Sequence, residues 1–249
     1  MGAEGTETER TRERLVGVWR RVLSLSWPVM AEQTTRTLMR TVDVFVTGLL
    51  SPAAVSAVGL ADLYARFPLR IGLGLGGGAI ALSSQDTGRG ADANRDEAVT
   101  QALVLGVLTG IPFVAFRLLF GRQAIALLGA PPRVAQMGGT YLGVILATAP
   151  ARHVALIGAR SLQGTGDTWT PMYVNVVANV LNGVGSVTLG LGYLGAPDLG
   201  VIGVALATAG ANVFTACVLV VAIAVGQRSV DEDPHTRATP RGRIPLPAG

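Results

Sequence analysis

The stretch AEQTTRTLMRTVDVFVTGLL, residues 31–50, has the length of a membrane-spanning helix and still carries four ionisable side chains. They follow one another at intervals of four, four and three residues: Glu32, Arg36, Arg40 and Asp43. A helix places positions with this spacing on one face. An ionisable group at the centre of a bilayer costs about 2.5–3.5 kcal/mol, so we expect this face to turn away from lipid toward a polar interior.

The next apolar stretch repeats the pattern. In ADLYARFPLR, residues 61–70, an aspartate and two arginines recur every four residues. Glu32 with Arg36, and Asp62 with Arg66, have the order that favours an ion pair four residues apart on a helix. We therefore predict these two pairs. A purely structural ladder of ion pairs near the cytoplasmic helix ends, where long Arg side chains reach outward, is the alternative.

Asp43 differs from the other members of the stripe because its side chain is short. It lies seven residues from the end of its stretch, at position 50, which is about 10 Å deep in a helix. Burial of a carboxylate at that depth makes it a candidate for binding and releasing a proton or a sodium ion. A structural partnership with Arg40 is the other interpretation.

Composition also indicates a membrane protein. The 249 residues are 49% hydrophobic and only 14% charged, whereas soluble domains have about 25% charged residues. The net charge is +4, but no basic run is interleaved with aromatic residues, so we expect no nucleic-acid partner. A single cysteine excludes an intramolecular disulfide and a cysteine-only metal cluster. No pairing of a nucleophile with a base is evident, so an enzyme is not expected.

We predict an all-α membrane protein with six spans, each near the ~20 residues that a bilayer requires. A charged cytoplasmic tail of residues 1–17 precedes the six-helix lobe of residues 18–226. Residues 227–249, rich in Pro and Arg, are expected to form a disordered cytoplasmic tail. The spans cover roughly residues 22–50, 53–83, 98–120, 136–161, 171–194 and 200–226.

The arginines outside the spans or at their ends predict the orientation. Twelve lie on the side that holds both termini, and only Arg122 and Arg133 lie on the opposite side. Because basic residues concentrate in cytoplasmic loops, we expect both termini in the cytoplasm and the protein in the plasma (inner) membrane.

A second polar stripe lies in the predicted fifth span, PMYVNVVANVLNGVGSV. Its members are spaced four, three and four residues apart: Asn175, Asn179, Asn182 and Ser186. The sixth span has a weaker stripe of Thr208, Asn212 and Thr215. Such side chains either line a polar cavity or form hydrogen bonds between helices, and both interpretations stay open.

Glycine and proline positions predict packing and bends. The run GLGLGGGAIAL, residues 72–82, lies inside a long apolar stretch, so we expect close helix packing and no phosphate-binding loop. Pro28 and Pro150 lie inside predicted spans and should kink them, because proline removes a backbone hydrogen bond.

Two groups of motifs resemble the MATE family, the multidrug and toxic compound extrusion transporters. The first combines an early proline (Pro28), an aspartate shortly before the segment VTG, and AVSAVGLA at residues 54–61. The second is the connector GTGDTWTPM at residues 164–172, which leads into the Asn-rich helix and is followed by LGVIGVALAT at 199–208. The likeness covers essentially residues 20–226.

The resemblance implies a secondary antiporter that exports organic cations or other amphiphiles while Na⁺ or H⁺ enters, with no organic cofactor. Family members have twelve helices in two six-helix lobes, with clefts for the solute. Carried over, Asp43 is the ion-coupling carboxylate, with a possible Na⁺ site there, and Pro28 sets a bend. Asn182, with Asn179 and Asn175, supplies neutral ligands. Many relatives have a second Asp where this chain has Ser186, and Glu32, Arg36 and Arg40 make the cavity face more charged than usual.

Only the N-terminal lobe of that family pattern is present in this sequence. A half-transporter could pair with a second copy or with a separate C-terminal lobe, and a truncated remnant or assembly partner without transport of its own is an alternative. A flippase for lipid-linked precursors is a further alternative, because the arginine-rich faces could line a cationic groove. The expected partners are the lipid bilayer and an amphiphilic small-molecule substrate.

Overall fold

A computed structural model describes residues 2–232, and every regular element in that range is helical. Short connectors separate the helices, and one 3₁₀ turn, η1, lies in the connector before the last helix. The helices are α1 (Gly2–Leu50), α2 (Pro52–Arg89), α3 (Asp92–Leu127), α4 (Pro132–Ala147), α5 (Ala149–Gly164), α6 (Trp169–Leu191) and α7 (Val201–Glu232), and η1 is Tyr193–Gly195.

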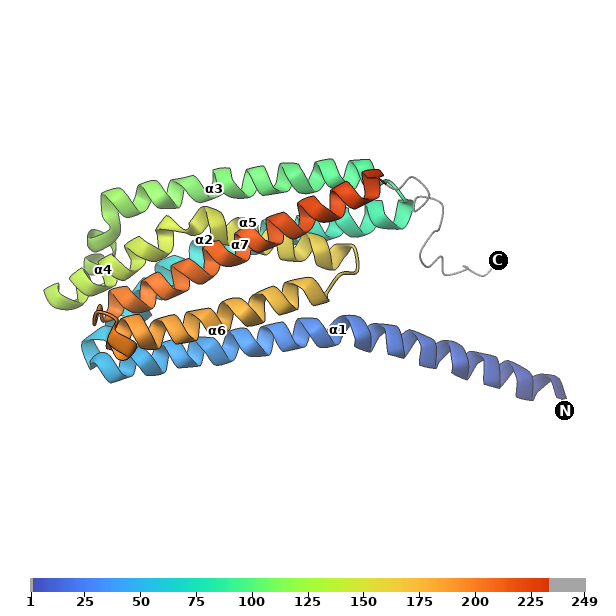
Figure 1. The fold of residues 1–249 in the computed structure, drawn as a ribbon, viewed down its shortest axis with the longest axis horizontal. Coiled ribbons are helices and arrows are strands. Elements are labelled where there is room, and N and C mark those ends of the chain that lie inside the picture. Colours follow the sequence, from blue (N-terminus) through green and yellow to red (C-terminus); the bar gives the residue numbers. More distant parts are fainter. Residues whose placement is uncertain (1, 233–249) are drawn as a thin grey trace.

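The long helices run roughly along a common direction (Figure 1). The α1 helix packs beside α6 along one edge of the bundle, and α3 lies at the opposite edge against α4 and α5. The N-terminal part of α1 projects beyond the other helices (Figure 1). Between the two edges, α2 packs on α4 and α5, and α7 packs on α6 and α5. This arrangement brings α1, α2, α5, α6 and α7 around a common interior.

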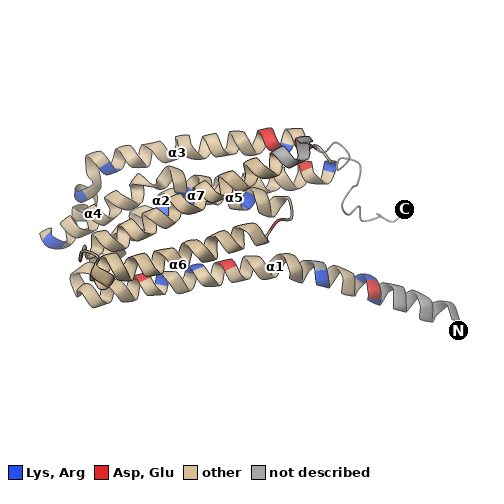
Figure 2. Ribbon diagram, in the orientation of Figure 1, with Lys and Arg blue, Asp and Glu red and all other residues tan. Residues whose placement is uncertain are grey.

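The six predicted spans correspond to α1, α2, α3, the α4–α5 pair, α6 and α7. Within the described chain, α3, α6 and the α7 segment Val201–Gln227 are each long and apolar enough to cross a membrane, and α4 with α5 qualifies as one bent span. The α1 and α2 helices run alongside them but carry the charged stripes, which lowers their hydropathy (Figure 2). The seven helices therefore form one lobe, in which up to four segments of the described chain qualify as membrane spans by length and composition.

The helix ends follow local sequence signals. Ser51 caps the start of α2, because its Oγ accepts a hydrogen bond of 3.1 Å from the backbone N–H of Ala54, and Pro52 occupies the first turn. Gly90 ends α2 and Gly192 ends α6, with φ of 70° and 71°. Glycine adopts this left-handed conformation without a steric penalty, so both helices stop there.

Proline produces the predicted bend in the fourth span. The span breaks at Thr148, and α4 and α5 meet there at 49°. Pro150 lies in the first turn of α5, where its missing N–H ends the hydrogen-bond ladder of the preceding helix. Pro28 lies inside α1 and its side chain is fully buried, while the helix continues through it.

Some glycines allow close approach between helices, as predicted. A Cβ at Gly76 would lie 2.9 Å from the Arg160 side chain in α5, and one at Gly72 would lie 2.9 Å from the His153 ring. Gly74, Gly77 and Gly78 have open space at this position instead. The glycine-rich run therefore packs with one face against α5 and leaves the other face smooth.

His153 connects three helices. Its ring is completely buried in α5, with Nε2 2.8 Å from the backbone oxygen of Pro68 in α2. Its Nδ1 lies 3.1 Å from the backbone oxygen of Gly106 and 3.1 Å from Oγ1 of Thr109, both in α3. These contacts tie α2, α3 and α5 together at the level of the cavity.

The ends of the lobe differ in length from the prediction. The first helix begins at Gly2, so the segment predicted as a charged tail continues the helix of the first span. The last helix continues to Glu232, six residues past the predicted end of the lobe at 226. The rest of the predicted C-terminal tail lies outside the described residues.

Candidate functional site

A polar cavity of about 430 Å³ opens between the helices of the interior. Six of the predicted site residues line it, from α1 and α6. The predicted stripe of α7 lines the same cavity. These residues are Arg36, Arg40, Asp43, Asn175, Asn179 and Asn182, with Thr208, Asn212 and Thr215. The charged face of α1 and the amide face of α6 therefore meet at one cavity.

Asp43 is held by two neutral donors from α6. Asn182 Nδ2 donates to Asp43 Oδ2 at 3.0 Å, and Ser186 Oγ donates to Asp43 Oδ1 at 2.8 Å. Asn182 and Ser186 stand four residues apart on α6, so one helical face presents both donors. No cation among the described side chains forms an ion pair with Asp43. Arg40 therefore forms no ion pair with Asp43, although it acts on this carboxylate electrostatically.

Arg40 pairs across helices instead. Its Nη2 lies 3.6 Å from Asp62 Oδ2 in α2, and both side chains reach the cavity. The predicted Asp62–Arg66 pair within α2 is absent, because Asp62 faces α1 and no described residue pairs with Arg66. The rule for spacing within one helix could not take account of a neighbouring helix with a competing arginine.

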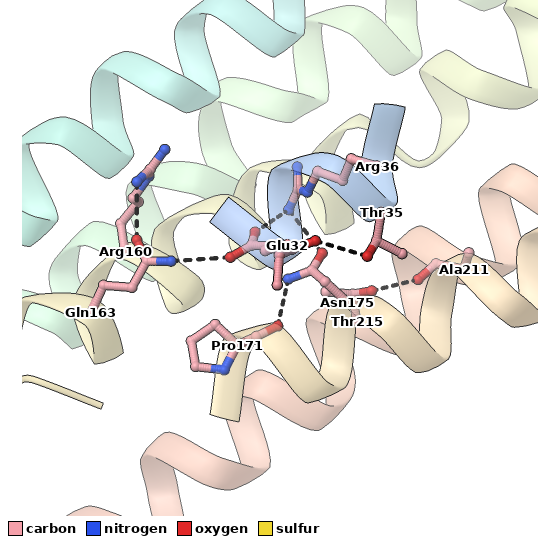
Figure 3. Close-up of polar contacts among 10 residues, drawn as sticks. Glu32, Thr35, Arg36, Arg160, Gln163, Pro171, Asn175, Ala211 and Thr215 are labelled. Carbon is pink, nitrogen blue, oxygen red and sulfur yellow. Dashed lines mark hydrogen bonds and ion pairs between the residues drawn. The ribbon is translucent and has the colours of Figure 1, made fainter. Parts of the chain in front are cut away.

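Near the N-terminal end of the charged stripe on α1, a series of polar contacts links α5 through α1 to α6 (Figure 3). Gln163 Nε2 donates to Glu32 Oε2 at 3.1 Å, and Glu32 Oε1 pairs with Arg36 Nη2 at 3.0 Å. Arg36 Nη2 also donates to Asn175 Oδ1 at 2.8 Å. On the α5 side, Arg160 donates to Gln163 at 2.9 Å. The predicted Glu32–Arg36 pair is thus confirmed as part of a larger network.

Two expected cavity residues need correction. Glu32 is 4% exposed and Ser186 is 0% exposed, and neither lines the cavity. Both lie behind the wall, because their polar atoms already contact Arg36 and Gln163, or Asp43. Their function is to hold the residues that do face the cavity.

Arg152 and Tyr141 are among the lining residues that sequence reasoning missed. Arg152 lies in α5 and Tyr141 in α4, on either side of the break at Thr148. Neither belongs to a stripe of polar residues, so spacing could not reveal them. The available signal was the isolated charge of Arg152 within an apolar span, which by itself marks a functional position in a membrane protein.

Charges are unevenly distributed among the helices around the cavity. The α6 helix carries no charged residue, so it contributes only amides and hydroxyls to the site (Figure 2). The described residues contain no group of three or more His, Cys, Asp or Glu side chains that could hold a metal ion. The groups that contact the Asp43 carboxylate directly are the neutral side chains of Asn182 and Ser186, and Asp62 lines the same cavity.

Comparison with known proteins identifies the family. The MatE family profile matches residues 28–188, which is more than half of the chain. The chain belongs to the MatE family. The matched region includes Asp43, the cavity residues of α2, α4 and α5, and the amide face of α6.

Curated relatives of this MatE chain are multidrug resistance proteins. It is 28% identical over 207 residues to the probable multidrug resistance protein YoeA of Bacillus subtilis, covering 82% of this chain and 44% of the relative. It is 31% identical over 195 residues to the probable multidrug resistance protein NorM of Bradyrhizobium diazoefficiens, covering 78% and 41%. The chain thus spans less than half the length of these relatives.

Solved structures share the fold. The Vibrio cholerae MATE transporter VcmN in its bent form superposes with a TM-score of 0.75 at 22% identity, over 89% of this chain and 50% of that one. A MOP superfamily transporter from Pyrococcus furiosus gives 0.73 at 24% identity, over 83% and 45%. With the apolar helices, these likenesses make the chain a multi-pass membrane protein of the transporter fold.

Proposed function

We propose that this chain forms one lobe of a cation-coupled antiporter that exports drug-like or xenobiotic organic solutes, with Na⁺ or H⁺ as the coupling ion. The observation that carries the proposal is Asp43, a carboxylate without a cationic partner among the described residues, at the wall of a cavity inside a membrane lobe. The multidrug resistance relatives support export as the direction of transport.

Asp43 has the surroundings that a reversible ion site requires. Neutral donors hold its carboxylate, so a proton or Na⁺ can bind without displacing a permanent counter-ion. The Oδ1 atom of Asn182 is buried and has no hydrogen-bond partner among the described residues. This acceptor belongs to a side chain that contacts Asp43, and oxygen ligands of this kind suit a hard cation.

The cavity also suits a small organic solute. Its volume of about 430 Å³ falls within the ~300–1,000 Å³ of small-molecule sites. Apolar side chains, Val44, Val58, Leu69, Ile145 and Leu156, lie among the polar ones on its wall. An amphiphile could place its apolar part on these residues and its polar groups on the amides and charges.

Alternating access needs a second moving body. In transporters built from repeats, the two halves move relative to each other around a binding site near the middle of the membrane. The proposed partner of this lobe is a second copy of the chain or a separate C-terminal lobe. We place both termini in the cytoplasm and the protein in the inner membrane, because twelve of the fourteen arginines outside the predicted spans or at their ends lie on that side.

The proposal is tested by reconstituting the protein in liposomes with an imposed Na⁺ or proton gradient. Gradient-dependent flux of a fluorescent amphiphile is expected, and Asp43→Asn should reduce it by at least tenfold, since the amide keeps the shape but cannot carry the charge. The measurement is initial flux per unit of inserted protein.

Thr188→Ala is the matched control, because Thr188 is a partly buried residue of α6 that does not line the cavity and whose hydroxyl bonds only its own helix. This variant should transport normally. Well-folded protein that shows no gradient-dependent flux, or Asp43→Asn protein that transports like the wild type, would favour the assembly partner without transport of its own.

A further inference from the structure

We propose that the cavity contains an anion subsite, formed by Arg152 and Tyr141, that binds a carboxylate or phosphate group of the solute. The inference rests on the proposed function, since it assigns a chemical class to the solute of that same cavity. Arg152 projects from α5 and Tyr141 from α4, so the 49° bend between these helices brings a guanidinium and a phenol to one wall.

Arg152 has no partner in the part of the chain that the structure describes. It is partly buried, and no described residue forms a hydrogen bond or an ion pair with it. The charged side chains that act on it electrostatically include Arg36 and Arg40, and the carboxylate of Asp62, which is already paired with Arg40. A guanidinium removed from bulk water and placed beside two other cations is costly unless an anion joins it.

Tyr141 supplies a second donor at the same place. Its side chain is 6% exposed and lines the cavity, and its hydroxyl forms no hydrogen bond with a described residue. Tyr141 and Arg152 line the same cavity. A buried tyrosine hydroxyl usually finds a partner, and an acceptor that reaches both groups would satisfy both.

Amide donors of α6 and α7 at the same cavity also lack partners among the described residues. The Nδ2 atoms of Asn179 in α6 and Asn212 in α7 are buried without a hydrogen-bond partner among the described residues, and both residues line the cavity. The terminal torsion of an amide is soft, so an acceptor in the cavity can recruit these groups by a small rotation. Donors from four helices therefore surround one space.

The charged residues that line the cavity also favour an anion. Four arginines line the cavity and only two aspartates do. Arg36 is neutralised by Glu32 behind the wall, and Arg40 by Asp62. Arg66 and Arg152 remain without an acidic partner among the described residues, against the single carboxylate of Asp43. A solute that carries only positive charge would leave these donors unsatisfied.

The ligand chemistry is an oxyanion with at least two acceptor oxygens. A guanidinium binds carboxylates and phosphates through paired hydrogen bonds that match its fork of donors. The group can belong to a free solute or to the head group of an acidic lipid that enters the cavity from the bilayer. The two sources share the same contacts and differ in how the anion reaches the cavity.

The test is equilibrium binding by calorimetry, with the purified chain in nanodiscs of phosphatidylcholine. The probes are naphthalene-2-carboxylate and its uncharged counterpart naphthalene-2-carboxamide, which have nearly the same shape. Because hydrogen bonds to charged groups are the stronger ones, we expect the carboxylate to bind at least about tenfold more tightly.

Variants separate the subsite from general folding effects. Arg152→Gln should abolish the preference for the carboxylate, so that the two probes bind with an affinity ratio of about one. Arg152→Lys should retain part of the preference, and Tyr141→Phe should weaken it severalfold. Arg117→Gln is the matched control, since Arg117 is partly buried in α3 but does not line the cavity, and it should keep the full preference.

A second set of nanodiscs containing phosphatidic acid distinguishes the two sources. If a lipid head group occupies the subsite, this lipid lowers the apparent affinity for the carboxylate in the wild type but not in Arg152→Gln. If a free solute is the ligand, the lipid has no effect. Both results support the subsite.

Equal binding of the two probes by the wild type, or an unchanged preference in a folded Arg152→Gln protein, would overturn the inference. Calorimetry requires no transport, so its outcome is independent of the liposome experiment. Flux without a carboxylate preference would contradict the proposed subsite alone. A carboxylate preference without flux would support the subsite and contradict the proposed antiporter function.

Discussion

At the scale of single residues, α1 and α6 meet through one carboxylate and its two donors. Asn182 and Ser186 each contribute one hydrogen bond to Asp43. Hydrogen bonds to a charged group are worth about 1.5–3 kcal/mol each. The strength with which Asp43 binds a cation should therefore depend on both donors, and on the free oxygen of Asn182.

Replacement of Asn182 tests this dependence. Asn182→Ala removes one donor to Asp43 and the unpaired Oδ1. We expect the Na⁺ or proton concentration that gives half-maximal flux to change by about tenfold, with the direction showing whether the amide favours the ion-free or the ion-bound carboxylate. The measurement is flux across a series of ion concentrations. An unchanged midpoint would mean that Asn182 is not part of the ion site.

Individual residues also show what sequence could predict. The spacing of the stripes correctly placed Arg36, Asp43 and Asn182 on facing surfaces, because helical period depends on sequence alone. Pairing was predictable only within one helix, so Glu32–Arg36 was found and Arg40–Asp62 was not. Arg152 belongs to no periodic pattern, and only the folded chain shows that it reaches the same cavity.

At the scale of elements, glycine sets how closely the helices approach. A Cβ at Gly110 in α3 would lie 2.5 Å from the backbone of Pro150, just beyond the break between α4 and α5. A Cβ at Gly203 in α7 would overlap the backbone of Leu189 in α6. Backbone cannot move aside as a flexible side chain can, so both positions require glycine. Sequence predicted close packing for a glycine run in α2 and did not single out these two positions.

Alanine substitutions test these close contacts. Gly110→Ala and Gly203→Ala should each destabilise the lobe by about 1–3 kcal/mol, the usual cost of overpacking. The measurement is the thermal midpoint of the purified protein in detergent, followed by size-exclusion chromatography.

Gly74→Ala and Gly78→Ala in α2 are the matched controls, because nothing lies within 4 Å of a Cβ at either position. They should leave the midpoint unchanged or raise it, since alanine favours helix over glycine. A similar loss of stability in all four variants would show that steric contact is not the cause.

At the scale of the whole molecule, the lobe is a set of helices whose polar faces meet inside and whose apolar faces point outward. Exposed large hydrophobic side chains occur on every long helix, including Leu118 and Leu119 in α3 and Val221 in α7. This is the reverse of a soluble protein and matches a surface in contact with lipid. The six segments, their inward faces and a bend at Pro150 were predictable from sequence, whereas the division of the fourth segment into two helices at Thr148 and the extent of α1 emerged only from the structure.

The orientation is testable by cysteine labelling in intact cells. In a Cys217→Ser background, Asp198→Cys places an exposed thiol in the α6–α7 connector, and Thr165→Cys places one in the α5–α6 connector. The distribution of arginines predicts that a membrane-impermeant maleimide labels the first variant from outside and the second only after lysis. The opposite pattern would reverse the proposed topology.

The length of α1 has a practical consequence. Its 49 residues form a rod of roughly 74 Å at 1.5 Å per residue, more than twice the ~30 Å thickness of the hydrocarbon core. The projecting turns belong to the same helix as Asp43, so they act as a lever arm that magnifies any tilt of that helix. A spectroscopic label near the N-terminal end of α1 would therefore detect a tilt of the helix caused by a change at Asp43. The label would move in the aqueous phase, where its displacement is easiest to measure.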